Sequence, residues 1–391
     1  MKVLLVHSAY QQFGGEDSVV RAETELLQKH GDEVCHYTRH NDEIKQFGLI
    51  DKAAFLPQTV YSWKTSGEIE DVVRQFKPDV AFIHNVYPLI SPSAYHKLHA
   101  LGVPTVQVLH NFRLHCPNGL FYTQGKICEA CKGGNYLNAV AKRCYKDSYA
   151  LSGLYAMTLG LNRLGGVIQK ISGFICLTEF FKLKMQEAGV PDSKLFVRPN
   201  FVYAPALPAS ETPGNKYVLF MGRLSAEKGC WTLIRAFEKL PQVPLKILGT
   251  GPMEQELRDY IHEKGIGNVE LLGFKSGAEK WAILRNALCL VLPSEWYENF
   301  PVTALEAFMA CKPVIAARLG GLPYIVEEGK SGLLFEAGNV SELAQKVQAL
   351  VDSPAEAARM GERGRMLTET KYGPDEGYSN LMKIFSQVQA A

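Results

Sequence analysis

The sequence contains neither a long apolar run nor an excess of one charge. No stretch of its 391 residues reaches the roughly 18 apolar residues that a membrane-spanning helix needs. The 42 Lys and Arg side chains nearly balance the 40 Asp and Glu side chains, which argues against a nucleic-acid-binding module. The N-terminal stretch MKVLLVHSAYQQFGG has too few apolar residues for a signal peptide. Hydrophobic residues at 47% and charged residues at 21% exclude a disordered or collagen-like chain, so we expect two or three globular domains.

Disulfide-scaffold features are missing as well. The number of cysteines, nine, is odd, and five of them stand singly in apolar stretches: Cys35, Cys176, Cys230, Cys289 and Cys311. Scattered single cysteines are typical of a reducing compartment. We therefore expect a soluble cytoplasmic protein.

Short apolar runs alternate with longer amphipathic segments along most of the chain. This rhythm predicts an α/β fold with two doubly wound parallel sheets. Arg198–Asn215, rich in Pro, Ala, Ser and Thr, is expected to link the two halves. The predicted strands are Lys2–His7, Val34–Tyr37, Asp79–His84 and Thr105–His110 in the first half, and Tyr217–Met221, Leu245–Leu248, Val269–Leu272, Leu288–Leu292 and Val314–Ala316 in the second.

These runs define the expected domains. We assign residues 1–205 to an N-terminal domain with a cysteine-rich insertion at 116–144, and residues 206–372 to a C-terminal domain. A helix at 373–391 is expected to pack back on the N-terminal domain. Ligands of such sheets bind beyond the carboxyl ends of the strands, so the loops that follow the strands should carry the function.

Glycines mark three of these loops. Gly14-Gly15 follows the first strand, where an ordinary tight turn is the simpler interpretation, and the G-x-G-x-x-G dinucleotide fingerprint is missing. Gly249-Thr250-Gly251 follows a strand of the second half and permits close approach of the backbone to a ligand. A single G-x-G is a weak signal on its own.

The loop Gly222–Gly229 is more informative. Its two glycines bracket Arg223 and Lys228 between a predicted strand and a helix. Two cations at this position could neutralise a diphosphate without a metal, although a solvated loop explains the spacing about as well.

Two carboxylates follow the predicted strand Leu288–Leu292. Glu298 lies where a helix is expected to begin, and Glu306 lies eight residues on, so both could lie on one side of that helix. A carboxylate in an apolar helix needs a partner, which could be a ribose hydroxyl or, alternatively, a structural Lys or Arg. The backbone amides of Asn299–Val302 could receive phosphate or sugar oxygens.

Together these motifs resemble the retaining glycosyltransferases of family 4. The resemblance extends from about Tyr217 to Asp352 and, more loosely, over the N-terminal half. It implies the GT-B architecture, with two Rossmann-like domains. The motifs that carry it are Gly222-Arg223…Lys228-Gly229, Gly249-x-Gly251-Pro252, Glu298-x7-Glu306-Ala307, Lys312–Ala316, Gly320-Gly321-x-Pro323 and Gly329-x-x-Gly332.

The family also implies residue roles. Arg223 and Lys228 would bind the donor diphosphate, Glu306 the donor ribose, and Glu298 the hydroxyls of the transferred sugar. His110 would face the donor sugar at the reaction centre, whereas His7 and His84 are expected to be structural. Gly15 matches the glycine loop on the acceptor side. The donor-binding residues implied are Gly15, Gly222, Arg223, Lys228, Gly249, Gly251, Asn299, Phe300, Pro301, Val302 and Glu306, with no cofactor required for catalysis.

Three positions depart from the family pattern. Tyr324 stands where Glu is common, Cys311 where Gly is usual, and Pro301 where Gly is frequent. All three adjoin the expected nucleotide and sugar sites. They leave the identity of the donor, a UDP- or GDP-sugar, open.

Four further cysteines form a separate cluster: Cys116, Cys128, Cys131 and Cys144. Four thiolates are the ligand set of a closed structural zinc site, while unliganded reduced cysteines in an inserted loop are the alternative.

A local excess of positive charge lies around this insertion. Residues 101–200 hold 12 Lys and Arg against 5 Asp and Glu, with aromatic and aliphatic side chains interspersed. Such a surface suits peripheral contact with anionic lipid on the inner face of the cell membrane, unless the apolar groups are core.

The sequence thus predicts a retaining glycosyltransferase that moves a sugar from a nucleotide donor to an acceptor hydroxyl of a lipid-linked glycan or polysaccharide precursor. A sugar-nucleotide epimerase on the same fold and a non-catalytic zinc-bearing interaction protein are the alternatives. A dehydrogenase is disfavoured by the missing fingerprint.

Overall fold

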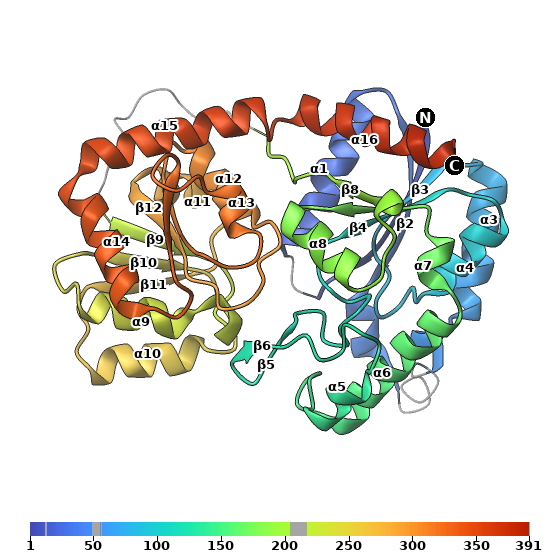
Figure 1. The fold of residues 1–391 in the computed structure, drawn as a ribbon, viewed down its shortest axis with the longest axis horizontal. Helices are drawn as coiled ribbons and strands as arrows, with labels where there is room; N and C mark the ends of the chain where they lie inside the picture. Colours follow the sequence, from blue (N-terminus) through green and yellow to red (C-terminus); the bar gives the residue numbers. More distant parts are fainter. Residues whose placement is uncertain (12–13, 49–54, 56, 204–216, 391) are drawn as a thin grey trace. The chain divides into compact units, whose positions relative to one another are not determined.

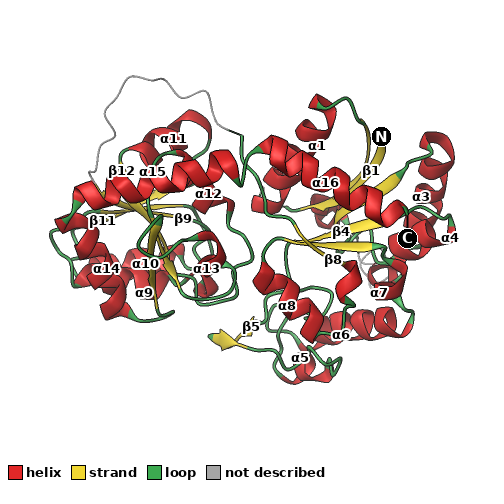
Figure 2. Ribbon diagram, turned by 45° about the horizontal axis from the view of Figure 1, so that its top comes forward, coloured by secondary structure: helices red, strands yellow, loops and turns green. Residues whose placement is uncertain are grey.

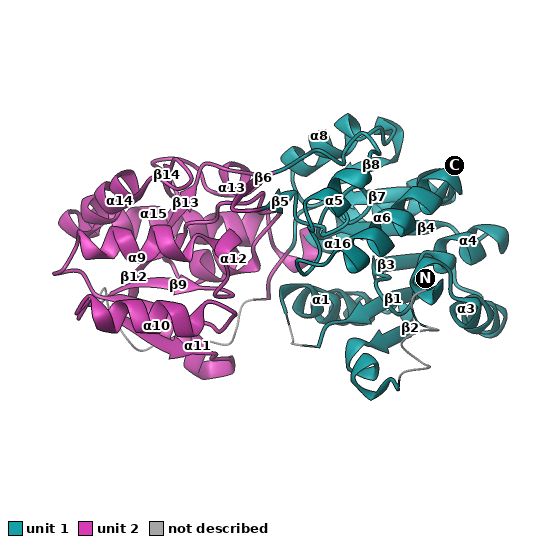
Figure 3. Cartoon of the chain, turned by 90° about the horizontal axis from the view of Figure 1, so that it is seen from below, with its two compact units in different colours: residues 1–123, 128–200, 377–391 teal, residues 124–127, 201–376 magenta. Residues whose placement is uncertain are grey.

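A computed structural model describes residues 1–11, 14–48, 55, 57–203 and 217–390. The chain forms two compact units (Figure 3). Unit 1 comprises Met1–Thr123, Cys128–Asn200 and Gly377–Ala391, and unit 2 comprises Gln124–Ile127 and Phe201–Glu376. The expected boundary at 205/206 lies outside the described residues, as does most of the expected linker.

Unit 1 is built on a six-stranded parallel sheet with the order β2-β1-β3-β4-β7-β8 (Figure 1). The aliphatic run Val3–Val6 of β1 is completely buried, as expected for a strand covered on both faces. Because β2 and β3 lie on opposite sides of β1, the direction of winding reverses between β1 and β3. The strands are β1 Lys2–Ala9, β2 Glu33–His40, β3 Val80–Asn85, β4 Thr105–Leu109, β7 Gly173–Cys176 and β8 Leu195–Val197.

Helices flank this sheet, and the C-terminal helix is one of them (Figure 2). In α16, the Tyr378 ring stacks on His30 at 3.7 Å, and the Phe385 ring meets Phe82 of β3 edge-on at 5.4 Å. The helices are α1 Gly15–Lys29, α3 Trp63–Phe76, α4 Ser93–Ala100, α5 Leu137–Ala141, α6 Tyr149–Leu164, α7 Val167–Lys170, α8 Glu179–Glu187 and α16 Pro374–Gln389, with 3-10 turns at Asn41–Gln46 and Asp192–Lys194.

Unit 2 is built on a second six-stranded parallel sheet, with the order β11-β10-β9-β12-β13-β14. Its winding reverses between β9 and β12. The strands are β9 Tyr217–Met221, β10 Leu245–Leu248, β11 Val269–Gly273, β12 Ala287–Leu292, β13 Val314–Ala317 and β14 Gly332–Phe335. The helices are α9 Cys230–Glu238, α10 Glu254–Glu263, α11 Gly277–Arg285, α12 Val302–Met309, α13 Leu322–Ile325, α14 Val340–Asp352 and α15 Pro354–Thr370, with a 3-10 turn at Ala226–Lys228.

The predicted pair of parallel sheets is confirmed, and the nine predicted strands are present. Three further strands of three or four residues, β7, β8 and β14, were not among the predicted ones. A small hairpin of β5 Tyr122–Thr123 and β6 Lys126–Ile127 lies in the cysteine-rich insertion. Among the described helices, none is both long and apolar enough to cross a bilayer.

A buried ion pair ties three segments of unit 1 together. Arg198, just after β8, donates to the two Glu23 carboxylate oxygens of α1 at 2.5 and 3.0 Å, and both side chains are 1% exposed. The Arg198 Nε also donates to the Gly377 carbonyl of α16 at 2.9 Å. The pair therefore links α1, the sheet and the C-terminal helix.

Replacing Glu23 with alanine leaves the Arg198 charge buried without its carboxylate. We expect the free energy of unfolding to fall by about 3–5 kcal/mol. Glu25→Ala on the same helix is the matched control, since the exposed Glu25–Lys29 pair should contribute less than about 1 kcal/mol. Urea unfolding of the two variants measures the difference, and equal losses would contradict the prediction.

Candidate functional site

In unit 2, the loops that follow β9 and β12 are held together by close backbone contact. Gly229 has φ +70°, and a Cβ at this position would lie 1.9 Å from the Pro293 carbonyl oxygen. The Glu295 amide donates to the Glu227 carbonyl at 2.9 Å. Glycine at 229 is therefore required for the packing of one loop on the other.

Two more of the predicted glycines serve the loops that follow β9 and β10. A Cβ at Gly249 would lie 1.9 Å from the Gly222 oxygen, and one at Gly251 would lie 2.3 Å from the Leu224 oxygen. The Leu224 amide donates to the Thr250 carbonyl at 3.0 Å. These glycines allow the backbones of the two loops to pack directly against each other. The sequence predicted only that glycine would let the backbone approach a ligand.

The loops after β9 and β12 bring Lys228 and Glu298 together. The Lys228 Nζ lies 2.6 Å from the Glu298 Oε1, and the Ser294 hydroxyl donates to the same oxygen at 2.7 Å. Burial raises the pKa of Glu298, but the Lys228 charge and the hydrogen bonds outweigh it, so that the pKa is lowered and the carboxylate is ionised. The pair lies where the winding of the sheet reverses, the position at which such sheets bind ligands.

The prediction that one helix carries both glutamates is wrong, because α12 begins only at Val302, after Glu298. Glu306 does lie on α12, where its Oε1 is 2.6 Å from the Lys280 Nζ of α11. The structural salt bridge considered as the alternative for Glu306 is thus present. Pro301 has no amide hydrogen, so the run Asn299–Val302 cannot offer four donors.

The other residues of unit 2 that the sequence singled out lie in the same loops as Lys228 and Glu298 or in segments that follow them. Arg223 is exposed in the loop after β9, and Phe300 is buried with its ring 5.4 Å from that of Tyr372. Cys311 has φ +55°, which explains why glycine is usual at this position of the family. Tyr324, on α13, is 45% exposed.

In unit 1, three histidines meet at the carboxyl ends of three neighbouring strands. The His110 Nε2 lies 2.9 Å from the His84 Nδ1, and the His7 ring lies edge-on to His84 at 6.4 Å. Burial, and the charge of His7, lower the pKa of His110 to about 3, and burial lowers that of His84 well below its ordinary value. His110 and His84 are therefore neutral imidazoles at pH 7.

His7 and His84, expected to be structural, are therefore neighbours of the candidate catalytic histidine. Their shared position at the ends of adjacent strands was the signal in the sequence that could have placed them. Two acidic residues of α1 adjoin this group. The Asp17 Oδ1 lies 2.9 Å from the His7 Nε2, and Glu16 accepts from the Tyr10 hydroxyl at 2.9 Å.

The Glu16 side chain is 9% exposed, and burial raises its pKa to about 8. It is therefore mostly protonated at pH 7. Gly15 begins α1, and a Cβ there would have no neighbour within 4 Å, so packing does not require glycine at this position.

The four clustered cysteines lie near one another in unit 1. Burial first, and then the charges of Cys116, Cys144 and Cys128, raise the pKa of Cys131 to about 12. Burial raises the pKa of the Cys116 thiol. Hydrogen bonds from the backbone amides of residues 118–121 lower it by less, so the pKa stays above its ordinary value. Within the described ranges, no three His, Cys, Asp or Glu side chains are arranged so that they could hold a metal ion. The zinc site stays a prediction, and its geometry is not formed here.

Two family models match consecutive parts of the chain. The model "Glycosyltransferase Family 4" matches residues 13–204, and the model "Glycosyl transferases group 1" matches residues 208–366.

Individual relatives align over about half of their own length. An uncharacterized glycosyltransferase of Methanocaldococcus jannaschii is 31% identical over 170 residues, which are 44% of this chain and 48% of that protein. A 2-deoxystreptamine N-acetyl-D-glucosaminyltransferase of Niallia circulans is 29% identical over 189 residues, covering 46% and 48%. The crystal structure of Anabaena HepE in complex with UDP superimposes with a TM-score of 0.69 at 17% identity, covering 99% of this chain and 100% of that one.

Gly251→Ala should destabilise unit 2, since the new methyl group would meet the Leu224 backbone. We expect the free energy of unfolding to fall by about 1–3 kcal/mol. Gly267→Ala is the control, because a Cβ there has no neighbour within 4 Å. Thermal or urea unfolding compares them, and a Gly251→Ala variant as stable as the control would contradict the packing role.

The buried groups of unit 1 predict a stability maximum near pH 6.5. Below this pH, the unfolded chain protonates histidines that stay neutral when folded, so stability falls as the pH falls. Between pH 6.5 and 8, Glu16 keeps its proton only when folded, so stability falls by about 1.4 kcal/mol per pH unit as the pH rises.

Glu16→Gln should remove the alkaline decline and leave the acidic one. Urea midpoints at pH 5.5, 6.5 and 8 measure both slopes, with Glu25→Gln as the matched control. An unchanged alkaline slope in Glu16→Gln would mean that Glu16 is ionised in the folded protein.

Proposed function

Because the chain belongs to the GT-B glycosyltransferases of the family 4 and group 1 type, we propose that it transfers a sugar from a nucleotide-sugar donor to an acceptor hydroxyl with retention of anomeric configuration. The observation that carries the proposal is the 2.6 Å contact between Lys228 and Glu298 at the reversal point of the unit 2 sheet. It places a fixed cation and a fixed carboxylate at the position where doubly wound sheets bind nucleotides.

In this proposal, the bond between the anomeric carbon and the donor diphosphate breaks while the acceptor oxygen bonds to the same face of the sugar. The acceptor proton passes to the leaving diphosphate. Lys228 and the exposed Arg223 stabilise the charge that develops on the diphosphate, so that no metal cofactor is required. Glu298, ionised and held by Lys228 and Ser294, accepts hydrogen bonds from hydroxyls of the transferred sugar.

His110 contributes as a neutral group. Because its Nε2 is already within hydrogen-bond distance of His84, it would meet the sugar through Nδ1, and an uncharged imidazole suits a hydroxyl of the donor sugar and not its diphosphate. The glycines Gly222, Gly249 and Gly251 hold the loops around the donor, and Glu306 binds the ribose.

We propose a UDP-sugar as the donor, since Anabaena HepE, which shares the fold, was crystallised with UDP, and a GDP-sugar is the second choice. The proposed acceptor is a glycan or lipid-linked glycan precursor in polysaccharide biosynthesis. The nine cysteines are all free, which supports a cytoplasmic location.

A thermal-shift series with UDP, GDP, ADP and NAD tests the donor. At about 100 times its dissociation constant, the correct nucleotide should add roughly 2.7 kcal/mol to the stability of the folded state. Stabilisation by NAD alone, or by no nucleotide, would contradict the proposal. Release of free UDP from a UDP-sugar only when acceptor is added would separate a transferase from an epimerase.

Glu306→Ala and Lys280→Ala separate the two roles open to Glu306. If Glu306 binds ribose, its loss should weaken nucleotide binding about tenfold or more, because a hydrogen bond to a charged group is lost. Lys280→Ala keeps the carboxylate and should leave nucleotide binding within a few-fold of the wild type. Equal effects of both variants would make the ion pair structural and remove Glu306 from the donor site.

A further inference from the structure

Helix α6 of unit 1 has a composition that is unusual for a surface helix. Its 16 residues, Tyr149–Leu164, include one charged side chain, Arg163. A surface helix ordinarily turns a charged face to water, which this sequence cannot supply. The helix is nevertheless well specified, because the Ser148 hydroxyl at its N-cap accepts from the Leu151 amide at 3.3 Å.

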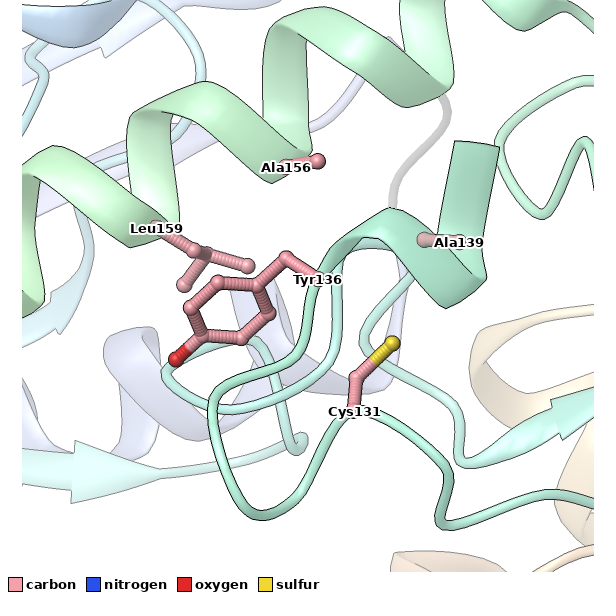
Figure 4. Close-up of a cluster of buried hydrophobic side chains, with 5 residues drawn as sticks. All are labelled: Cys131, Tyr136, Ala139, Ala156 and Leu159. Atoms are coloured by element: carbon pink, nitrogen blue, oxygen red, sulfur yellow. The ribbon is translucent and has the colours of Figure 1, made fainter. Parts of the chain in front are cut away.

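One face of α6 is buried. Ala156 and Leu159 pack with Tyr136 and Ala139, at the start of α5, and with Cys131 of the insertion (Figure 4). This contact explains only the apolar residues on the inner face.

The opposite face is apolar and exposed. Tyr149, Met157, Leu161 and Leu164 are 62%, 52%, 48% and 86% exposed, at intervals that place the last three along one side of the helix. Trp63 is 80% exposed. We call these five side chains the apolar face.

Ring contacts place Trp63 at the same end of α6 as Leu164. The ring of His96 lies 3.3 Å from the position of a Cβ on Gly165, the residue after α6. The ring of Tyr61 lies 6.1 Å from that of His96 and 4.7 Å from that of Trp63. The two most exposed members of the apolar face therefore belong to one region of the surface.

The segment around the apolar face is cationic. Residues 130–170 contain six Lys and Arg and one Asp, a net charge of +5. Arg143, before α6, is about half exposed and pairs with the exposed Asp147 at 3.3 Å, and Lys146, three residues on, is exposed. In a symmetric pair of chains these cations would face their own copies and repel, whereas an anionic surface would complement them.

We propose that the apolar face docks on an anionic lipid bilayer as a peripheral anchor. The apolar side chains would enter the boundary between headgroups and acyl chains, and the Lys and Arg residues would lie against lipid phosphates. Only the biological consequence rests on the proposed function: an enzyme held in this way would meet a lipid-linked acceptor at the bilayer surface.

Vesicle co-sedimentation of the full chain tests this. Vesicles of phosphatidylcholine with about 30% phosphatidylglycerol should bind the wild type at least about tenfold more strongly than pure phosphatidylcholine, with a loss of binding in high salt. Met157→Glu with Leu161→Glu should reduce binding about tenfold or more. Met366→Glu, which changes an equally exposed methionine of unit 2, is the matched control and should bind like the wild type.

UDP-induced thermal stabilisation is recorded for each variant, and retained stabilisation shows that the variant is folded. Failure to bind vesicles while UDP still stabilises the chain would overturn the anchor and leave the proposed function intact. Vesicle binding by a wild-type chain that UDP does not stabilise would contradict the proposed function and leave the anchor intact. A wild-type dimer that Met157→Glu with Leu161→Glu dissociates would identify the apolar face as a protein interface and overturn the lipid proposal.

Discussion

The reversal of strand order within each sheet is the constraint on which the candidate sites depend. At this point, the segments that follow two neighbouring parallel strands turn to opposite faces of the sheet. The loops after these strands therefore separate, and polar backbone and side-chain groups are left between them at the carboxyl ends of the strands. In unit 2 this point lies between β9 and β12 and holds Lys228 and Glu298. In unit 1 it lies between β1 and β3, which carry His7 and His84 near their carboxyl ends.

The two reversal points differ in their electrostatics. Unit 2 holds a paired cation and an ionised carboxylate, with exposed Arg223 in the same loop as the cation. Unit 1 holds neutral imidazoles and a largely protonated Glu16, because burial outweighs other effects there. Unit 2 thus offers a paired cation and carboxylate, whereas unit 1 sets neutral imidazoles and a largely protonated Glu16 beside Asp17, whose pKa is lowered by its hydrogen bonds to His7 and to backbone amides.

Much of this arrangement was predictable from the sequence, because continuous aliphatic runs such as Val3–Val6 specify buried parallel strands and place the loops that follow them. Contacts between segments distant in the chain were not predictable. No local pattern shows that Gly229 is needed against Pro293, that Lys280 meets Glu306, or that Arg198 meets Glu23. The start of α12 was misplaced because helical spacing from Glu298 to Glu306 does not show where the helix begins, and Pro301 was the overlooked marker. The exposed side of α6 was likewise hidden, since apolar residues facing water and apolar residues facing the core look alike in a sequence.

The discontinuity of unit 1 has a consequence for biosynthesis. Phe385 covers Phe82, and Gly377 accepts from Arg198, so the first unit lacks part of its core and one partner of its buried arginine until its last segment has been translated. Apart from four residues of the insertion, unit 2 is contiguous, so its core does not depend on the segment that follows Glu376. The unit whose synthesis begins first therefore cannot complete its core until that segment joins it, because Phe82 and Arg198 lack their C-terminal partners before then.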